Sequence, residues 1–200
     1  MRNVVHKVFQ DLLGRAPSEG VARDWSLQLE EGASHSTLAS CLLHSEENRE
    51  RVISKFYLQF LGRAPGAETL LYWKEQNQED LLAALLAGEE YFDKNGKTPA
   101  LFVRALFRDL LKRFPTISEI EAWVGLMSSH SATREDVVRD FLEHEEYRAL
   151  LVKEWFWLYL RRLPDGETVD HWMDRWRNGM TRETVQIGIL SSREYLFTAS

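Results

Sequence analysis

The chain has 200 residues, of which 44% are hydrophobic, 28% are charged and one is cysteine. This composition is that of an ordered globular protein, and it excludes a disordered chain and an intrachain disulfide framework. The net charge of −6 lacks the basic excess of a phosphate-binding surface, so nucleic acid is not an expected partner. No stretch approaches the roughly 18 apolar residues of a membrane span, and the first residues lack the features of a secretory signal.

One motif recurs four times: an arginine, one residue, a proline, seven residues and a tryptophan. The tryptophans are 48, 50 and 49 residues apart, a period typical of repeat proteins. We therefore predict an all-α fold, a tandem array of four three-helix repeats of about 50 residues that forms one domain over residues 1–200. The copies, numbered 1 to 4, span approximately 1–44, 45–92, 93–143 and 144–200. The motif residues are Arg15, Pro17 and Trp25; Arg63, Pro65 and Trp73; Arg113, Pro115 and Trp123; and Arg162, Pro164 and Trp172.

Each copy begins with a predicted helix whose apolar residues recur at helical spacing. Gly14 and Gly62 are expected to end this helix in the left-handed conformation. Lys112 and Arg161 replace that glycine in copies 3 and 4, where we expect a different helix end. The predicted buried residues are Val5, Val8, Phe9, Leu12 and Leu13; Ile53, Phe56, Tyr57, Phe60 and Leu61; Val103, Leu106, Phe107, Leu110 and Leu111; and Val152, Trp155, Phe156, Tyr159 and Leu160.

A second helix carries the motif tryptophan, and a third, shorter helix follows, with Thr133 and Thr181 as expected N-caps. The periodic tryptophans, together with Trp155 and Trp176, are predicted core residues, and Cys41 is predicted to be a small buried residue. Residues 93–99 form the best candidate for a flexible break.

An acidic signature closes each copy: SEEN, GEEY, HEEY and SREY. In the first three copies it is expected to open the first helix of the next copy, because glutamate favours the positive end of a helix. Only LFTAS follows the fourth signature, so the natural chain continues past residue 200 or this end is a cap.

Each copy carries the motif arginine and a glutamate in its acidic signature. One interpretation is a ligand site for a carboxylate, a phosphate or a sugar in each copy. The other is an internal ion pair that ties the turn to the third helix, since a guanidinium matches a carboxylate bidentately. Because every copy has both partners, we favour the structural pair and predict one in each copy. The pairs are Arg15–Glu47, Arg63–Glu90, Arg113–Glu146 and Arg162–Glu194.

The first helix of copy 4 departs from the others at Trp157 and Leu158. The apolar side chains of the even copies indicate either packing between copies 2 and 4 or against a terminus, or an exposed patch for a partner or a second chain. We take Trp157, Leu158 and Leu58 as the candidate partner-binding residues. The equivalent positions hold Gln10 and Asp11 in copy 1, Leu58 and Gln59 in copy 2, and Arg108 and Asp109 in copy 3.

The sequence shows no familiar catalytic signature, so we predict neither an enzyme nor a metal or other cofactor. The six histidines do not recur in register, and no pair has the His-x3-His spacing of a helical metal site. His144, Glu145 and Glu146 can be drawn as an acid–base cluster, but the Glu-Glu element of several copies favours a solvated helix start. An active site would need such groups to converge from different copies, which linear sequence leaves open.

The GRAP turn, the following tryptophan and glycine, and the Ser-x-Glu-Tyr segment resemble a bacterial repeat family, domain of unknown function 4214. The resemblance covers essentially the whole chain. It is strongest at LLGRAP with Trp25 and at FLGRAP with Trp73, whereas copies 3 and 4 have LKRFP and LRRLP. It implies an all-helical module of bacterial surface, secreted or S-layer-like proteins, without established catalytic residues. A more distant likeness to phycobilisome linker domains implies shared helical architecture.

We therefore expect a non-catalytic protein-interaction or scaffold domain of a bacterial surface, secreted or assembly protein, bound to a protein partner or to itself. The alternative is a carbohydrate-binding module that uses aromatic platforms and the stretch Arg175–Arg177 to hold a glycan. The chain as it stands carries no signal peptide, whereas the family likeness implies a secreted or cell-surface location.

Overall fold

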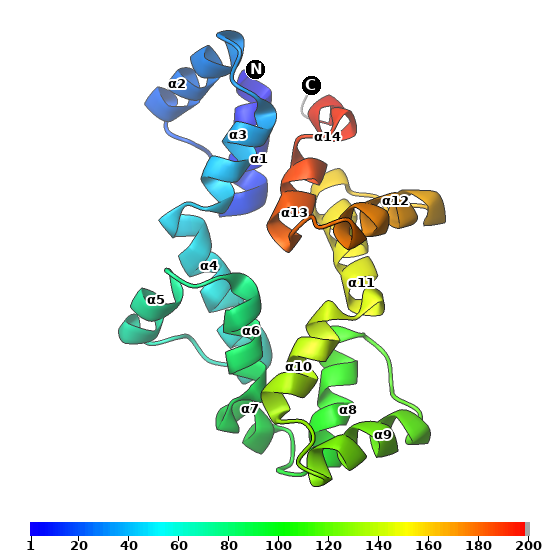
Figure 1. Cartoon of the computed structure of the whole chain (residues 1–200). Helices are drawn as coiled ribbons and strands as arrows, with labels where there is room; N and C mark the ends of the chain where they lie inside the picture. Colours follow the sequence, from blue (N-terminus) through cyan, green and yellow to red (C-terminus); the bar gives the residue numbers. More distant parts are fainter. Residues whose placement is uncertain (199–200) are drawn as a thin grey trace. The chain divides into compact units, whose positions relative to one another are not determined.

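The computed structural model describes residues 1–198, which form fourteen α-helices, two π-helical turns and no strand (Figure 1). The predicted all-α class is confirmed. Within this described part, no helix is both long enough and apolar enough to cross a membrane. The helices are α1 (Arg2–Leu13), α2 (Glu19–Glu30), α3 (His35–Leu43), α4 (Glu46–Phe56), η1 (Tyr57–Leu61), α5 (Ala67–Trp73), α6 (Gln78–Ala87), α7 (Glu89–Lys94), α8 (Pro99–Leu110), α9 (Ile117–Ser128), α10 (Arg134–Glu143), α11 (Glu145–Trp155), η2 (Phe156–Leu160), α12 (Gly166–Arg177), α13 (Arg182–Leu190) and α14 (Arg193–Phe197).

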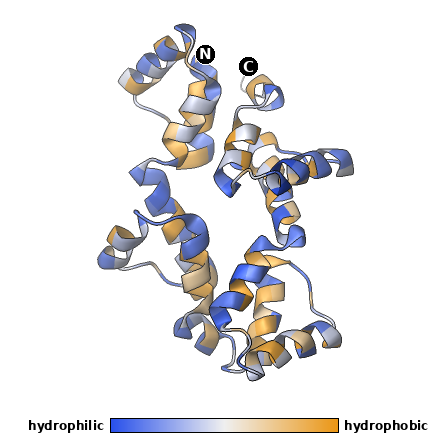
Figure 2. Ribbon diagram, in the orientation of Figure 1, coloured by the Kyte–Doolittle hydropathy of each residue, from blue (hydrophilic) through white to orange (hydrophobic). Residues whose placement is uncertain are grey.

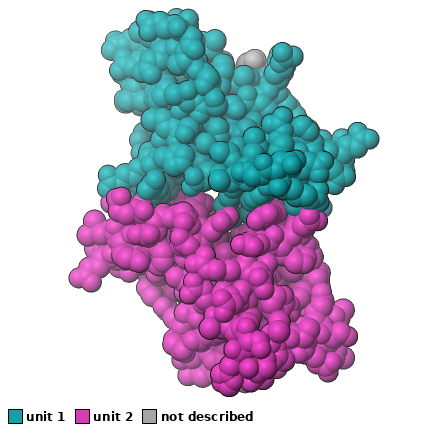
Figure 3. Space-filling model, in the orientation of Figure 1, with its two compact units in different colours: residues 1–51, 149–200 teal, residues 52–148 magenta. Residues whose placement is uncertain are grey.

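The chain divides into two compact units (Figure 3). Unit 1 comprises residues 1–51 and 149–200, and unit 2 comprises residues 52–148. Copies 1 and 4 therefore share unit 1, and copies 2 and 3 share unit 2. In unit 1 the third helix of copy 1, α3, packs against that of copy 4, α13; in unit 2, α6 packs against α10. The expected array, with every copy next to its sequence neighbours, is thus replaced by pairs, one of which joins copies far apart in the chain.

The predicted apolar stripes of the first helices form much of each core. In copies 1, 3 and 4 all five predicted stripe residues are buried; they lie in α1, in α8 and the residue that follows it, and in α11 and η2. In copy 2, Tyr57 and Leu61 are only half-buried. Figure 2 shows hydrophobic and hydrophilic residues interleaved along the ribbons of both units, as amphipathic helices require.

The end of the first helix has the same left-handed backbone in all four copies. The φ angle is 69° at Gly14, 76° at Gly62, 56° at Lys112 and 56° at Arg161. The expectation of a different end in copies 3 and 4 was wrong, because the turn into the proline segment imposes the conformation whatever the residue. For a residue other than glycine this conformation costs about 1–2 kcal/mol. In copy 3, Lys112 Nζ donates to the Asp109 carbonyl at 2.6 Å, which offsets part of the cost.

The acidic signatures open α4 and α11, as predicted, but the signature of copy 2 forms a separate helix, α7. The reason lies in the break that the sequence predicted at 93–99. Gly96 and Lys97 both have positive φ, 96° and 59°, and Thr98 then caps α8. The expected N-caps Thr133 and Thr181 are confirmed, since their hydroxyls accept from backbone N–H groups at 3.2 Å.

The tryptophans are less uniformly buried than predicted. Trp155, Trp172 and Trp176 are buried, whereas the motif tryptophans of copies 1 to 3 are only half-buried. Trp172 lies directly over Gly188 of α13, where an added Cβ would stand 2.8 Å from the ring. The equivalent positions of copies 1 to 3 carry side chains, and we expect these to hold the motif tryptophan farther from the third helix. They are Cys41, Ala84 and Asp140.

Cys41 is exposed, so the prediction of a buried thiol was wrong. The prediction rested on the apolar residues around Cys41. The nine-residue helix α3 packs by one face only, so only some of these residues are buried. The core face of α3 is taken by Leu38, Ala39, Leu42 and Leu43.

Candidate interaction site

Each motif arginine binds the glutamate of the acidic signature that follows it, through two parallel hydrogen bonds. The expected pairing is confirmed, but the expected place of the glutamate was wrong: it lies in the helix after the third one, in α4, α7, α11 or α14. Nε donates to one carboxylate oxygen and Nη2 to the other. In copy 4, Arg162 Nε donates to Glu194, and Nη2 reaches the second oxygen at 2.7 Å. The remaining distances are 2.6 and 2.5 Å for Arg15–Glu47, 2.5 and 2.5 Å for Arg63–Glu90, and 2.7 and 3.0 Å for Arg113–Glu146.

The guanidinium groups make two further contacts that also recur. Nη1 donates to the carbonyl of the next residue, at 3.1 Å for Arg15 and 3.4 Å for Arg113. Each guanidinium also lies against the aromatic ring six positions earlier, at 4.7–5.7 Å from the ring centroid. The donors thus point inward at the chain's own acceptors, which supports the structural interpretation over a ligand site for an anion.

In copies 1, 2 and 4 the ion pair raises the pKa of the arginine and lowers that of the glutamate. The hydrogen bond from Arg15 lowers the pKa of Glu47, and the bond from Arg162 lowers the pKa of Glu194. The side chains remain about half exposed, so solvent screens the attraction. The pairs therefore fix the geometry of the turn more than they stabilise the fold.

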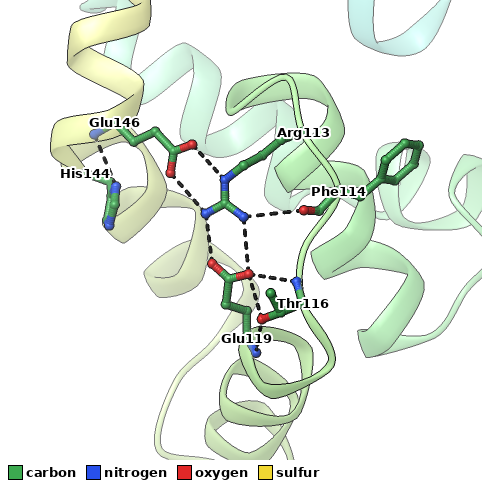
Figure 4. Close-up of polar contacts among 6 residues, drawn as sticks. All are labelled: Arg113, Phe114, Thr116, Glu119, His144 and Glu146. Atoms are coloured by element: carbon green, nitrogen blue, oxygen red, sulfur yellow. Dashed lines mark hydrogen bonds and ion pairs between the residues drawn. The ribbon is translucent and has the colours of Figure 1, made fainter.

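Arg113 differs from the other three because it binds a second carboxylate (Figure 4). Its Nη2 donates to Glu119 at 2.8 Å and its Nη1 at 3.2 Å, so one guanidinium holds Glu119 and Glu146 together. Glu119 also closes a capping box with Thr116 at the start of α9. The hydrogen bonds from Arg113, followed by those from Thr116, lower the pKa of Glu119 to about 2.

Figure 4 also shows His144, the histidine of the possible acid–base cluster. Its Nδ1 accepts from the backbone N–H of Glu146 at 3.3 Å. The imidazole therefore caps α11, and the carboxylate of Glu146 faces Arg113. The arrangement is that of a helix start. Among residues 1–198, no group of three or more His, Cys, Asp or Glu side chains is placed to hold a metal ion.

The first helices of copies 2 and 4 each end in a π-helical turn, at equivalent positions. These two helices run unbroken from the signature to the motif arginine, and sixteen positions separate Glu47 from Arg63 and Glu146 from Arg162. A π turn widens the helix locally and changes the direction of the side chains that follow. Neither π turn was predicted from the sequence, although the apolar residues Leu58 and Trp157 mark the same position in both turns.

The candidate residues Leu58 and Trp157 are the second residues of the two π turns. Leu58 is 64% exposed and Trp157 is 59% exposed; Leu158 is half-buried. Internal packing of these side chains, one of the two interpretations of the sequence, is therefore not observed for Leu58 and Trp157. Each unit presents one large apolar side chain from its π turn to solvent.

A tyrosine–aspartate contact joins the two copies within each unit, and sequence reasoning missed it. In unit 2, Tyr91 donates to Asp109 at 2.7 Å; in unit 1, Tyr195 donates to Asp11 at 2.8 Å. Burial, followed by the nearby aspartate, raises the pKa of each tyrosine. Burial raises the pKa of Asp109, but hydrogen bonds from Arg108 and Tyr91 outweigh it and bring the pKa below its usual value.

The arginine-rich stretch considered for a glycan is engaged within unit 1. The Arg175 guanidinium lies 5.4 Å from the Trp172 ring centroid, and Arg177 pairs with Asp174 at 2.7 Å. Trp176 stacks on Trp155 with centroids 6.0 Å apart. Of the seven tryptophans, only Trp157 is exposed; the other six are buried or half-buried.

Two compact helical units, each pairing two copies of one motif through their third helices, define an all-helical module with recurrent Arg–Glu turns. Residues 82–151 match the model of a family described as Domain of unknown function (DUF4214). This stretch begins in α6, covers copy 3 and ends in α11. The resemblance recognised in the sequence is thereby confirmed for this part of the chain. Comparisons with curated proteins and with solved structures gave no match.

Proposed function

We propose that the chain is built from four copies of one helical repeat and serves as a non-catalytic protein-interaction or scaffold module. The repeat is supported by the four Arg–Glu turns and the four left-handed helix ends. The non-catalytic role is supported by the use of the recurrent charged groups: they hold turns and helix starts, with their polar atoms directed at one another. The family likeness favours a bacterial surface, secreted or assembly protein as the host.

In unit 1 the proposed partner-binding residues are Trp157 and, beside it, Leu158; in unit 2 the proposed residue is Leu58, at the position equivalent to Trp157. The observation that carries this proposal is the exposure of a large apolar side chain at the same position of both π turns. A tryptophan that is mostly outside the core costs solubility, and such residues are enriched where proteins bind one another. π turns are also frequent at functional sites.

Site-specific cross-linking tests the proposal. A photoreactive amino acid at position 157, introduced into the chain in its producing cells, is expected to capture a partner protein that the same probe at position 163 does not capture. Leu163 is the matched control because it is 68% exposed in the same unit but lies outside the π turn. Binding of the captured protein should then fall at least tenfold in Trp157→Ala and stay unchanged in Leu163→Ala. Unchanged binding by a folded Trp157→Ala chain would remove Trp157 from the site.

Carbohydrate recognition is the alternative, and the exposed indole of Trp157 is the observation in its favour, since sugar rings stack on such faces. The stretch Arg175–Arg177 adds little, because Arg175 and Arg177 already have partners. A glycan array followed by a fluorescence titration decides between the two. A titratable glycan signal that Trp157→Ala abolishes would favour the alternative.

A further inference from the structure

The two units use the same contacts to pair their copies, and the contacts alternate along the chain. The tyrosine donors, Tyr91 and Tyr195, belong to the even copies 2 and 4. The acceptors, Asp109 and Asp11, belong to the odd copies 3 and 1, and the corresponding position in the even copies is Gln59 or Leu158. The signature of copy 3 also carries a tyrosine, Tyr147, so the aspartate is the part of the contact that distinguishes the copies. Two even copies lack this acceptor.

A lysine completes the even–odd match in unit 1. Lys7 of copy 1 donates to the Tyr159 carbonyl of copy 4 at 3.0 Å and to Asp11 at 2.9 Å. This carbonyl lies in the last turn of the helix, where backbone acceptors lack helical partners. In unit 2 the carbonyl at the equivalent position, that of Phe60, accepts from Lys94 at 3.0 Å. Asp11 itself is nearly buried, with 5% of its side chain exposed.

The pair in unit 2 joins consecutive copies, whereas the pair in unit 1 joins stretches separated by 97 residues of unit 2 (52–148). Every contact that holds copy 4 against copy 1 is therefore a contact between segments that no short loop ties together. Such contacts form equally well between two chains, which is the condition for exchange of identical elements between protomers.

We propose that the face of copy 4 formed by α13 and α14 is a binding site for copy 1 of a second chain, so that two chains associate head to tail through an exchanged unit 1 when their own copies 1 and 4 are not closed on each other. The partner is another chain of the same sequence, and it is recognised by the α3 face, by Asp11 and by Lys7. His44 and Glu183, 3.1 Å apart across the α3–α13 pair, belong to the same contact. This proposal is independent of the surface at Trp157.

The two forms of the contact compete through concentration. Within one chain copies 1 and 4 belong to the same molecule, so their closure does not depend on protein concentration, whereas association of two chains does. At micromolar protein the wild-type chain is therefore expected to close on itself and to be monomeric. The intermolecular form becomes visible when closure within the chain is prevented.

Two complementary full-length variants make that test. The first carries Asp11→Arg and Leu38→Asp, which break the copy 1 face; the second carries Val185→Asp and Tyr195→Arg, which break the copy 4 face. All four side chains are buried in unit 1 or nearly so. Each variant alone should be a monomer of about 23.4 kDa by light scattering, with unit 2 folded. Mixed in equal amounts, they should form a species of twice that mass, because one intact copy 4 then meets one intact copy 1.

A mixture that stays monomeric overturns the proposal, and so does a dimer formed by either variant alone, since that dimer would use another surface. Because a broken copy could also lose its own fold, a milder change gives a second measurement. Tyr195→Phe added to the chain with the intact copy 4 should weaken the heterodimer roughly tenfold, the loss of a hydrogen bond to a charged group. Tyr91→Phe, the equivalent change in unit 2, should leave its affinity unchanged. Equal effects of the two changes would also refute the assignment.

Trp157→Asp in both chains separates this proposal from the proposed function. The heterodimer should persist, because Trp157 takes no part in the copy 4–copy 1 contact. Loss of the heterodimer would mean that the chains associate through the Trp157 surface and not by exchange.

Discussion

Gly188→Ala tests why Trp172 alone among the motif tryptophans is buried. The new Cβ would stand 2.8 Å from two atoms of the Trp172 ring. Carbon atoms pack at about 3.5–4.0 Å, so the ring must retreat by about 0.7 Å or more. Overpacking of this kind costs about 1–3 kcal/mol. Alanine in place of glycine within a helix returns about 1 kcal/mol, so unit 1 should lose about 0–2 kcal/mol.

A double-mutant cycle isolates the contact from the helix propensity. Urea unfolding of Gly188→Ala, Trp172→Leu and the double variant should give a coupling of about 1–3 kcal/mol. With the indole gone, alanine at 188 should stabilise by about 1 kcal/mol. Gly125→Ala in α9 is a matched control, since no atom lies within 4 Å of its added Cβ. It should stabilise the wild-type chain by about the same amount.

If Gly188→Ala stabilises the chain as much as Gly125→Ala does, the absence of a side chain at position 188 does not explain the burial of Trp172. The same conclusion follows if the coupling with Trp172 is below about 0.5 kcal/mol, the usual scatter of independent sites. In that case the burial of Trp172 must come from its other neighbours, among them the Arg175 guanidinium.

Three further outcomes are expected. The folded-state pKa of Glu119, about 2, lies below its ordinary value of 4.5, so its contribution to stability is present above about pH 4.5 and is lost as the pH falls toward 2. The urea midpoint should therefore fall less steeply between pH 6 and pH 2 in Glu119→Gln than in wild type. Tyr91→Phe should cost about 1.5–3 kcal/mol in chemical denaturation, whereas Tyr72→Phe, at an exposed site, should change stability by less than about 0.5 kcal/mol. Lys112→Gly should raise the thermal midpoint by relieving about 1 kcal/mol of left-handed strain; an unchanged or lower midpoint would mean that the lysine's contact with Asp109 outweighs the strain.

The helical class and the core of the first helices were predictable because hydrophobic periodicity reports which face of a helix is buried. Val5, Val8 and Phe9 illustrate this, since their spacing alone placed them in the core. The exposure of Cys41 was not predictable in the same way. The second half of its helix, residues 38–43, is apolar except for Ser40, so the pattern did not say which of these residues the partner helix would cover.

Which copies pair with one another was the main feature of the fold that the recurring motif did not predict. A period near 50 residues suggests that neighbours stack, but the aspartates that accept from the tyrosines recur every two copies. Asp11 and Asp109 are 98 residues apart, and the two π turns begin 99 residues apart. The sequence shows this longer period, since copies 1 and 3 have an aspartate where copy 4 has Leu158. Its structural role could not be predicted, because the tyrosines that bind these aspartates meet them only in the fold: Tyr195 is far from Asp11 in the chain, and Tyr91 lies in another copy from Asp109.

The pairing of copies through their third helices also limits how such a chain can change its length. Gain or loss of a single copy would give an odd number of copies and leave the third helix of one copy without a partner. A change by two copies, close to one hundred residues, would keep every pair complete. The arginine–proline–tryptophan motif marks a single copy, but the segment that can be duplicated or deleted without loss of pairing consists of two copies.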